Sequence, residues 1–292
     1  MPFYNTEQLI KYFDALLQRN VTIATWKWLN EKINHFKGEK GSTVFCTAFT
    51  AVPRYTGKVI LSFNKDDLDQ KKDMGCEFSI TNYSVDRLAR VWLLMHWPSE
   101  NKTVYLTTIS QLFKVAEMNE LVALYGALPL LMYPEEWIKQ CIEGIRSNIG
   151  TVLEAIMLDN SYPADHLNEP AWNQLVLKAF FNEKPVNRII GLDKRANQTL
   201  AHILFDYADE RRAAQRTIDP QLWRLAGKFI DEHTYPDIKN AFDKGSAGEK
   251  EAIALACYES KFAPALALLD STPQLELAIQ NNKLNWEYIA VK

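Results

Sequence analysis

The strongest helical periodicity of the chain lies in PEEWIKQCIEGIRSNIGTVLEAIML, residues 134–158. At ~100° per residue its apolar side chains fall within about 120° of arc, the width of a helix face that packs on a core. Pro134 suits the first turn of a helix, where its missing N–H costs no hydrogen bond. We therefore predict a single helix over 134–158, within a central stretch, residues 117–212, that is mainly helical.

Helical signals continue on both sides of this stretch. Asn5 and Thr22 precede apolar periodic segments near the N-terminus, and Asn168 and Asn197 precede two more near the centre. Asn and Thr side chains accept hydrogen bonds from the unpaired N–H groups of a helix start, so each residue predicts a helix N-terminus. Residues 42–53 are rich in Thr, Val and Phe, which a strand would also favour. Because the neighbouring segments are helical, we predict a helix there too.

Short helical segments also end the chain. Asp219 and Pro220 form an N-cap and first-turn pair for QLWRLAGKFI, and further segments cover residues 235–244, 247–259, 261–270 and 273–282. Helices this short, joined by so few residues, pack as antiparallel neighbours. The predicted fold is all-α, with stacked antiparallel helix pairs in a HEAT-like α-solenoid or an irregular helical array.

Three regions follow from these patterns. Residues 1–83 form an N-terminal helical region with a long irregular connection, residues 84–223 a central helical core, and residues 224–292 a C-terminal region of short helices. We expect them to form one continuous domain. In the connection, Asp66, Asp67 and Asp69 invite comparison with the DDxxD motif that holds magnesium diphosphate, but their spacing differs. Lysines also surround them, so a solvated charge cluster that caps a short helix is favoured.

Composition limits the class of function. The 292 residues include 33 Lys and Arg against 36 Asp and Glu, a net charge of −3. Nucleic-acid-binding proteins usually carry a basic face, so no nucleic-acid partner is expected. The N-terminus lacks a basic region followed by an apolar core, and no apolar run approaches ~18 residues, so neither a signal peptide nor direct membrane insertion is expected. The cysteines form no CxxC pair, which is typical of a reduced, cytoplasmic protein.

Polar residues lie opposite the apolar face of the predicted 134–158 helix. Glu143, Arg146 and Glu154 share this side, and Glu120 lies at the start of the preceding helix. An arginine offers a planar fork that binds carboxylate or phosphate groups. The polar side is therefore either an ordinary solvent face with a surface ion pair or one wall of a binding groove.

A second group follows in residues 173–195. Asn173 lies beside a tryptophan, where it is either a surface residue or part of a buried hydrogen-bonded connection between helices. Lys178 points away from the apolar face of the same helix. Arg188, Asp193 and Arg195 surround Gly191 in a loop, where they either connect the loop to adjacent helix ends or bind an anion.

No metal or cofactor is expected. The five histidines show no HExxH or similar spacing, and the chain lacks nucleotide-binding glycine motifs and the GxSxG motif. No residue is therefore assigned a catalytic role.

The central strings resemble the EboA family, a bacterial family encoded in the ebo gene cluster. The resemblance covers residues 84–223 and rests on AEMNELVALYGALPLL, EGIRSNIGTVLEAIMLDNSYPAD, AWNQLVLKAFF, RIIGLDKRANQTLA and DYADERRAAQR. It implies a role in moving a secondary-metabolite precursor across the inner membrane towards the periplasm. It also implies partners among the other ebo-cluster proteins, which resemble a UbiA-type prenyltransferase, a TatD-like hydrolase and TIM-barrel proteins. No family catalytic residue is available to transfer.

Three functions are consistent with these observations. The first is a non-enzymatic binding or scaffold protein, cytoplasmic or held at the inner membrane through a partner, whose helix stack binds a metabolite or another ebo-cluster protein. Anionic groups would be bound by Arg146, Lys178, Arg188 and Arg195, and oriented by Glu120, Glu143 and Glu154. The second is an enzyme acting on an isoprenoid or aromatic precursor in a helical cavity, with Glu120 and Glu143 as the pair to test. The third is a structural adaptor that uses exposed Trp26, Trp28 or Trp286.

Overall fold

The computed structural model describes residues 5–67 and 79–291. Within these residues the chain consists of helices and connections, and the sole β-type pairing is an isolated antiparallel bridge between Ile60 and Ser84. Residue contacts group the chain into two compact units, Met1–Leu167 and Asn168–Lys292. The predicted all-α class is confirmed. The HEAT-like stacking and the three-region division stay predictions.

The N-terminal unit contains α-helices and two short 3₁₀ helices. They are α1 (Thr6–Asn20), α2 (Ile23–Asn34), α3 (Gly41–Thr56), α5 (Val85–His96), α6 (Lys102–Val115), α7 (Met118–Gly126), η1 (Leu128–Leu130), η2 (Pro134–Trp137), α8 (Ile138–Arg146), α9 (Gly150–Met157) and α10 (Tyr162–His166). The Asn5 side chain accepts hydrogen bonds at the start of α1, and Thr22 does so at the start of α2. Both predicted caps are confirmed, as is the helix predicted over 42–53.

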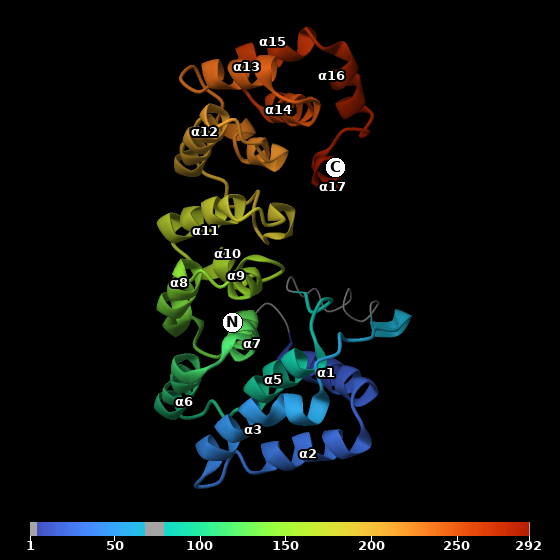
Figure 1. Cartoon of the computed structure of the whole chain (residues 1–292), viewed down its shortest axis with the longest axis vertical. Coiled ribbons are helices and arrows are strands. Elements are labelled where there is room, and N and C mark those ends of the chain that lie inside the picture. The colour runs from blue at the N-terminus through green and yellow to red at the C-terminus, as the bar shows by residue number, and fades with distance from the viewer. Residues whose placement is uncertain (1–4, 68–78, 292) are drawn as a thin grey trace. The chain divides into compact units, whose positions relative to one another are not determined.

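Helix α5 forms the centre of the N-terminal unit. It packs against α1, α3 and α7, and Figure 1 shows α1, α2, α3 and α5 side by side. The run from Val85 to Leu94 is buried except at Arg87. A helix that is buried almost all round must satisfy its own polar groups, and α5 does so with an ion pair between Asp86 and Arg90.

The helix predicted over 134–158 is interrupted, so this prediction was wrong. Residues 134–137 form a 3₁₀ turn, α8 ends at Arg146, and α9 begins at Gly150. Ser147 and Ile149 have extended backbones with ψ of 157° and 106°. Ser, Asn and Gly stand together at 147–150 and are weak helix formers. The break lets α9 pack against both α7 and α8, and this tertiary packing outweighs continuous helical periodicity.

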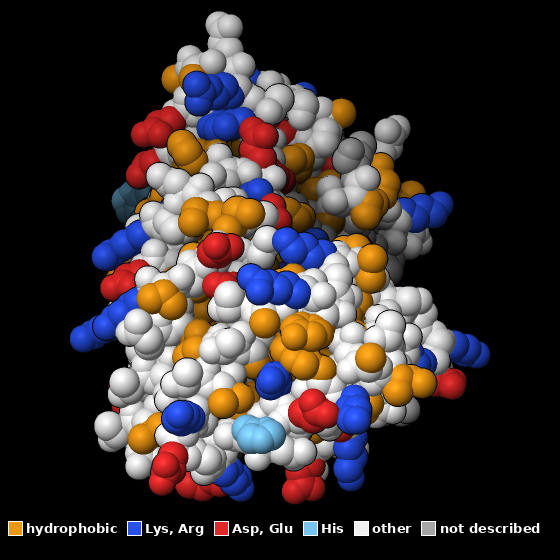
Figure 2. Space-filling view, turned by 60° about the horizontal axis from the view of Figure 1, so that its bottom comes forward, with side chains coloured by type: hydrophobic (Ala, Val, Ile, Leu, Met, Phe, Trp, Pro, Cys, Tyr) orange, Lys and Arg blue, Asp and Glu red, His pale blue; other side chains and the backbone are white. Residues whose placement is uncertain are grey.

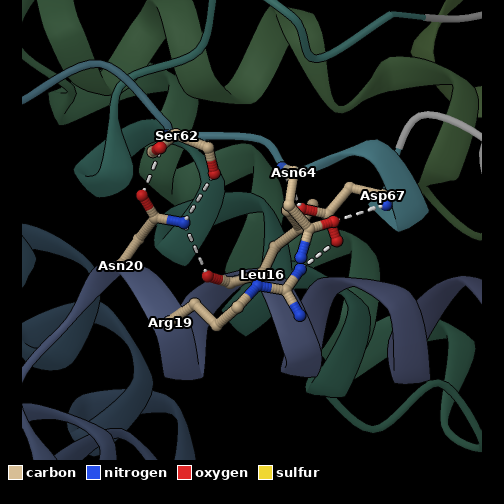
Figure 3. A network of polar contacts seen from close by, with 6 residues as sticks. All are labelled: Leu16, Arg19, Asn20, Ser62, Asn64 and Asp67. Carbon is tan, nitrogen blue, oxygen red and sulfur yellow. Dashed lines mark hydrogen bonds and ion pairs between the residues drawn. The ribbon is translucent and has the colours of Figure 1, made fainter.

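The connection after α3 is fixed to α1 by a polar network (Figure 3). Asn20 Nδ2 donates to the Ser62 carbonyl at 3.1 Å, and its Oδ1 accepts from the Ser62 N–H at 2.9 Å. Asp67, only 2% exposed, forms an ion pair with Arg19 and a reciprocal capping pair with Asn64. Asp67 is therefore buried and paired rather than solvated, so this part of the prediction was wrong. Asp69 lies outside the described residues.

The C-terminal unit contains shorter helices. They are α11 (Glu169–Phe181), η3 (Val186–Arg188), α12 (Gln198–Ala213), η4 (Pro220–Leu225), η5 (Gly227–Phe229), α13 (Tyr235–Lys244), α14 (Ala247–Glu259), α15 (Ala263–Asp270), α16 (Pro273–Gln280) and α17 (Trp286–Val291). Asn168 and Asn197 cap α11 and α12 as predicted. The segment after Pro220 forms two 3₁₀ helices instead of one α-helix. There Gly227 lies so close to α14 that an added Cβ would be 2.8 Å from the Ala256 carbonyl oxygen.

Helix α14 forms the centre of this unit. Its residues 252–257 are buried in succession, and it packs against η4, η5, α13, α15, α16 and α17. Burial raises the pKa of the Cys257 thiol to about 12, and it has the same effect on Cys141 in α8. These thiols stay protonated at neutral pH, so they act as small apolar side chains rather than nucleophiles.

Charges of both signs are mixed on the side of the N-terminal unit turned forward in Figure 2. Lys and Arg side chains alternate there with Asp and Glu, and hydrophobic side chains form small groups between them. This agrees with the near balance of charge in the sequence. Among the described residues, no helix is long and apolar enough to cross a membrane.

Candidate functional site

The polar residues predicted in the N-terminal unit have different surroundings. Glu120 is buried, and its carboxylate accepts a hydrogen bond from the Glu117 N–H at 3.0 Å as part of the capping box of α7. Glu143 and Arg146 are exposed on α8, and Glu154 is exposed on α9. Because the chain bends between α8 and α9, the argument that placed these side chains on one face of one helix no longer applies. A shared groove remains a prediction.

In the C-terminal unit, Asn173 is a buried structural residue. It exchanges side-chain hydrogen bonds of 2.8 and 3.2 Å with Asn197, the N-cap of α12. This reciprocal pair connects α11 to the start of α12, which was one of the two interpretations of its position beside Trp172. Lys178 of the same helix is half-buried, and burial lowers the pKa of its amine.

The loop before α12 is connected to its surroundings by charged side chains. Asp193 forms a two-pronged ion pair with Arg224 of η4, with 2.6 Å between Arg224 Nε and Asp193 Oδ1. The Arg195 guanidinium lies 4.8 Å from the ring centre of Trp172. Arg188 is half-buried in η3. Asp193 and Arg195 therefore have structural contacts, and anion binding by this loop remains a prediction.

The tryptophans proposed as exposed contact residues are half-buried and have internal contacts, so that description was wrong. Trp26 lies 5.5 Å from Trp92, and Trp28 stacks on Tyr55 with ring centres 3.9 Å apart. Trp286 Nε1 donates a 2.7 Å hydrogen bond to Glu259. None of them presents a fully available aromatic surface.

A cavity of about 410 Å³ lies within the C-terminal unit. Segments that are distant in sequence form its walls: the start of η3, the loop from α12 into η4, the start of α14, and the end of α17. The lining residues are Pro185, Val186, Asn187, Thr217, Ile218, Asp219, Pro220, Gln221, Ser246, Gly248, Ile289 and Ala290. Its size falls in the range of small-molecule sites.

Local hydrogen bonds hold the polar wall of the cavity. Asp219 caps η4 by accepting a 2.9 Å hydrogen bond from the Gln221 N–H, and Ser246 caps α14 by accepting from Glu249. Arg211 Nε donates to the Thr217 carbonyl at 2.7 Å, which fixes the loop before Asp219. The wall is therefore formed before any ligand binds.

Helix α17 closes another side of the cavity. The buried Gln221 side chain donates a 2.9 Å hydrogen bond to the Trp286 carbonyl, which anchors the first residue of α17 to η4. Ile289 is 6% exposed, and both Ile289 and Ala290 are part of the cavity lining. The part of the lining that α17 supplies is thus apolar.

Asp219 is the one formally charged residue among the described lining residues. Asp219 is exposed to solvent and is also part of the cavity lining. Partial desolvation raises the pKa of the Asp219 carboxyl, against the opposing effect of the hydrogen bond from Gln221. Asn187, Thr217 and Ser246 supply neutral polar groups. Such a lining can orient a ligand through hydrogen bonds while packing on its apolar part.

Sequence inspection identified Asp219 as a helix cap and did not identify the cavity. The cap is a local signal, because the hydrogen-bonding partner of Asp219 is two residues away. The cavity needs residues 185–187, 217–221, 246–248 and 289–290 to meet, and no spacing in the chain predicts this meeting.

A family model described as metabolite traffic protein EboA covers residues 9–227, which extends the resemblance seen in residues 84–223 towards the N-terminus. Comparison with curated proteins and with solved structures gave no match. Part of the cavity lining lies inside the matched range, and the lining from α14 and α17 lies beyond it.

Proposed function

Because the chain belongs to the EboA family of metabolite traffic proteins, we propose that it binds a small metabolite in the cavity around Asp219 without converting it. In this proposal the protein holds a secondary-metabolite precursor and passes it to other ebo-cluster proteins on the route towards the periplasm. The observation that carries the proposal is the cavity of about 410 Å³, whose lining combines polar and apolar residues.

The character of the lining supports binding rather than catalysis. General acid–base reactions commonly use two groups of different pKa that meet at the substrate. The described lining offers one carboxyl group, Asp219, and no histidine, lysine or second acid. Glu120, one of the two residues that the enzyme hypothesis requires, is buried in the capping box of α7. A pre-formed cavity with a single oriented acid suits recognition of a ligand.

Filling the cavity should abolish binding. Ala290→Trp on α17 places a large side chain in the lining, whereas Val291→Trp adds the same side chain at a neighbouring position that is 87% exposed. We expect a small molecule to co-purify with the wild-type protein and with Val291→Trp. It should be at least tenfold depleted from Ala290→Trp, because a loss of only ~1.4 kcal/mol of binding free energy already lowers the affinity tenfold. Mass spectrometry of extracts from cells with and without the other ebo genes measures this.

The outcomes separate the alternatives. Equal recovery from all variants, or no molecule from the wild-type protein, would reject the cavity as the binding site. If the purified protein, incubated with the recovered molecule, changes its mass, the enzyme hypothesis replaces simple binding.

A second candidate is a protein-binding surface at the exposed residues of α8 and α9. Glu143, Arg146 and Glu154 are accessible there, and charged side chains steer protein partners. We propose that this surface contacts another ebo-cluster protein. Arg146→Ala should weaken co-purification of that partner about tenfold or more. Unchanged recovery of the partner would reject Arg146 as a contact.

A further inference from the structure

The electrostatics of the cavity around Asp219 restrict the chemical class of its ligand. Two basic side chains near the cavity are directed to other acceptors. Arg211 donates to the Thr217 carbonyl and lies 3.7 Å from Glu183, while Arg212 forms a 2.6 Å ion pair with Glu249. Within the part of the chain that the structure describes, no Lys, Arg or His forms an ion pair with Asp219. The lining therefore carries an uncompensated negative charge.

Asp219 also retains hydrogen-bonding capacity. One carboxylate oxygen, Oδ1, accepts the Gln221 N–H, and the described residues provide no further donor to this side chain. A carboxylate has about four lone-pair positions, so several remain for a ligand. Because Asp219 is exposed and lines the cavity, a ligand in the cavity can reach its carboxylate oxygens. A cationic donor would pair with this carboxylate and offset its partial desolvation.

The apolar residues of the lining restrict the rest of the ligand. Val186, Ile218 and Ile289 provide aliphatic surface, and Pro185 and Pro220 add rigid apolar rings. A bare metal ion would find one carboxylate among these groups, whereas Ca²⁺ takes about six to eight oxygen ligands. An anionic ligand would meet the like charge of Asp219, which is unfavourable, and the nearby Arg211 and Arg212 are already directed to other acceptors.

We propose that the ligand is an organic cation, an amine on an apolar body, whose ammonium group pairs with Asp219 while the body packs on Val186, Ile218 and Ile289. This inference rests on the proposed function, because it assigns the ligand class of the same cavity. Charge-assisted hydrogen bonds are the strongest class available to such a site.

Three probes of similar size and different charge test the inference. They are phenethylamine, 2-phenylethanol and 3-phenylpropanoic acid, titrated against the wild-type protein and followed by ligand-observed NMR. We expect the amine to bind roughly 10- to 100-fold more tightly than the alcohol, the range given by a hydrogen bond to a charged group. The acid should bind most weakly.

Asp219→Asn is the decisive variant. Its amide oxygen can still accept the Gln221 N–H, so the η4 cap is kept while the charge is removed. The preference for the amine over the alcohol should disappear, and the affinity for the alcohol should change less than about threefold, since its contacts are mainly apolar. Val291→Trp should bind like the wild-type protein, and Ala290→Trp should bind none of the probes.

Failure of this inference differs from failure of the proposed function. If the alcohol or the acid binds as tightly as the amine and Ala290→Trp removes binding, the cavity holds small molecules but not organic cations. Persistence of the amine preference in Asp219→Asn would also overturn the assignment. If no probe binds the wild-type protein, the organic-cation class is rejected, and the co-purification experiment still decides whether the cavity holds a metabolite.

Discussion

Arg90→Met should lower the free energy of unfolding of the N-terminal unit by about 3–5 kcal/mol, the range for breaking a buried ion pair from one side. Arg90 Nη1 donates to Asp86 Oδ2 at 2.8 Å, and Arg90 Nε donates to the Phe49 carbonyl at 3.1 Å. The two side chains are 3% and 5% exposed. Methionine fills similar space but removes the Arg90 donor from the Phe49 carbonyl and from the Asp86 carboxylate, which keeps only the hydrogen bond from the Ser84 hydroxyl. The loss of stability comes chiefly from the buried charge of Asp86, which no longer has an ion-pair partner.

The double variant Asp86→Leu with Arg90→Met provides the matched control. It removes both charges, so it should recover most of the lost stability, since apolar replacements of a buried pair are often neutral. Urea unfolding measures the global effect, and hydrogen exchange of peptides from α3 and α5 assigns it to this unit. A loss below 1 kcal/mol in Arg90→Met, or a double variant less stable than the single one, would contradict the role given to this pair.

Local signals in the sequence predicted the helices well. Asn5, Thr22, Asn168 and Asn197 each cap a helix where the sequence indicated one, because a cap hydrogen bond joins residues only two or three positions apart. The short C-terminal helices also agree with their predicted ranges, since Gly, Ser and Pro breaks limit them on both sides. Such features depend on neighbours in the chain and can be inferred without knowledge of the fold.

The predictions that were wrong concern segments whose structure depends on contacts between residues far apart in the chain. Periodicity over 134–158 suited one helix, yet the packing of α9 on α7 and α8 favours a bend at 147–149. The 3₁₀ form of η4 and η5 is linked to the close approach of Gly227 to the α14 backbone, more than twenty residues away. Tertiary contacts outweighed local propensity in both places.

The sequence did not reveal the candidate site, because the site also depends on contacts between distant segments of the chain. Sequence inspection selected polar residues on helix faces and in one loop, and several of them proved to have structural partners. Asn173 pairs with Asn197, and Asp193 pairs with Arg224. Asp219 resembled an ordinary cap. What distinguishes it is the cavity that α14 and α17 complete around it, and this depends on how four separate segments pack together.

Trp223→Ala should destabilise the C-terminal unit by about 3–5 kcal/mol, the usual cost of removing a large buried aromatic side chain. Trp223 is 1% exposed, and its ring lies 5.9 Å from that of Phe205 in α12. It belongs to η4, which packs against α12, α14 and α17. A void at this position removes the contacts that hold η4 between its neighbours. The matched control is Phe181→Ala, where a side chain that is 69% exposed should change stability by no more than about 0.5 kcal/mol.

The same variant relates the fold to the cavity, because η4 begins with the residues that follow Asp219. Trp223→Ala should weaken binding of every probe together with stability, since it displaces the polar wall. Asp219→Asn should instead lose the preference for the amine while thermal unfolding stays close to that of the wild-type protein. If the free energy of unfolding of Trp223→Ala, measured in urea, lies within 1 kcal/mol of the wild-type value, η4 is held by contacts other than this ring. The cavity would then owe its shape to the anchoring of α17 through Gln221 and the Trp286 carbonyl.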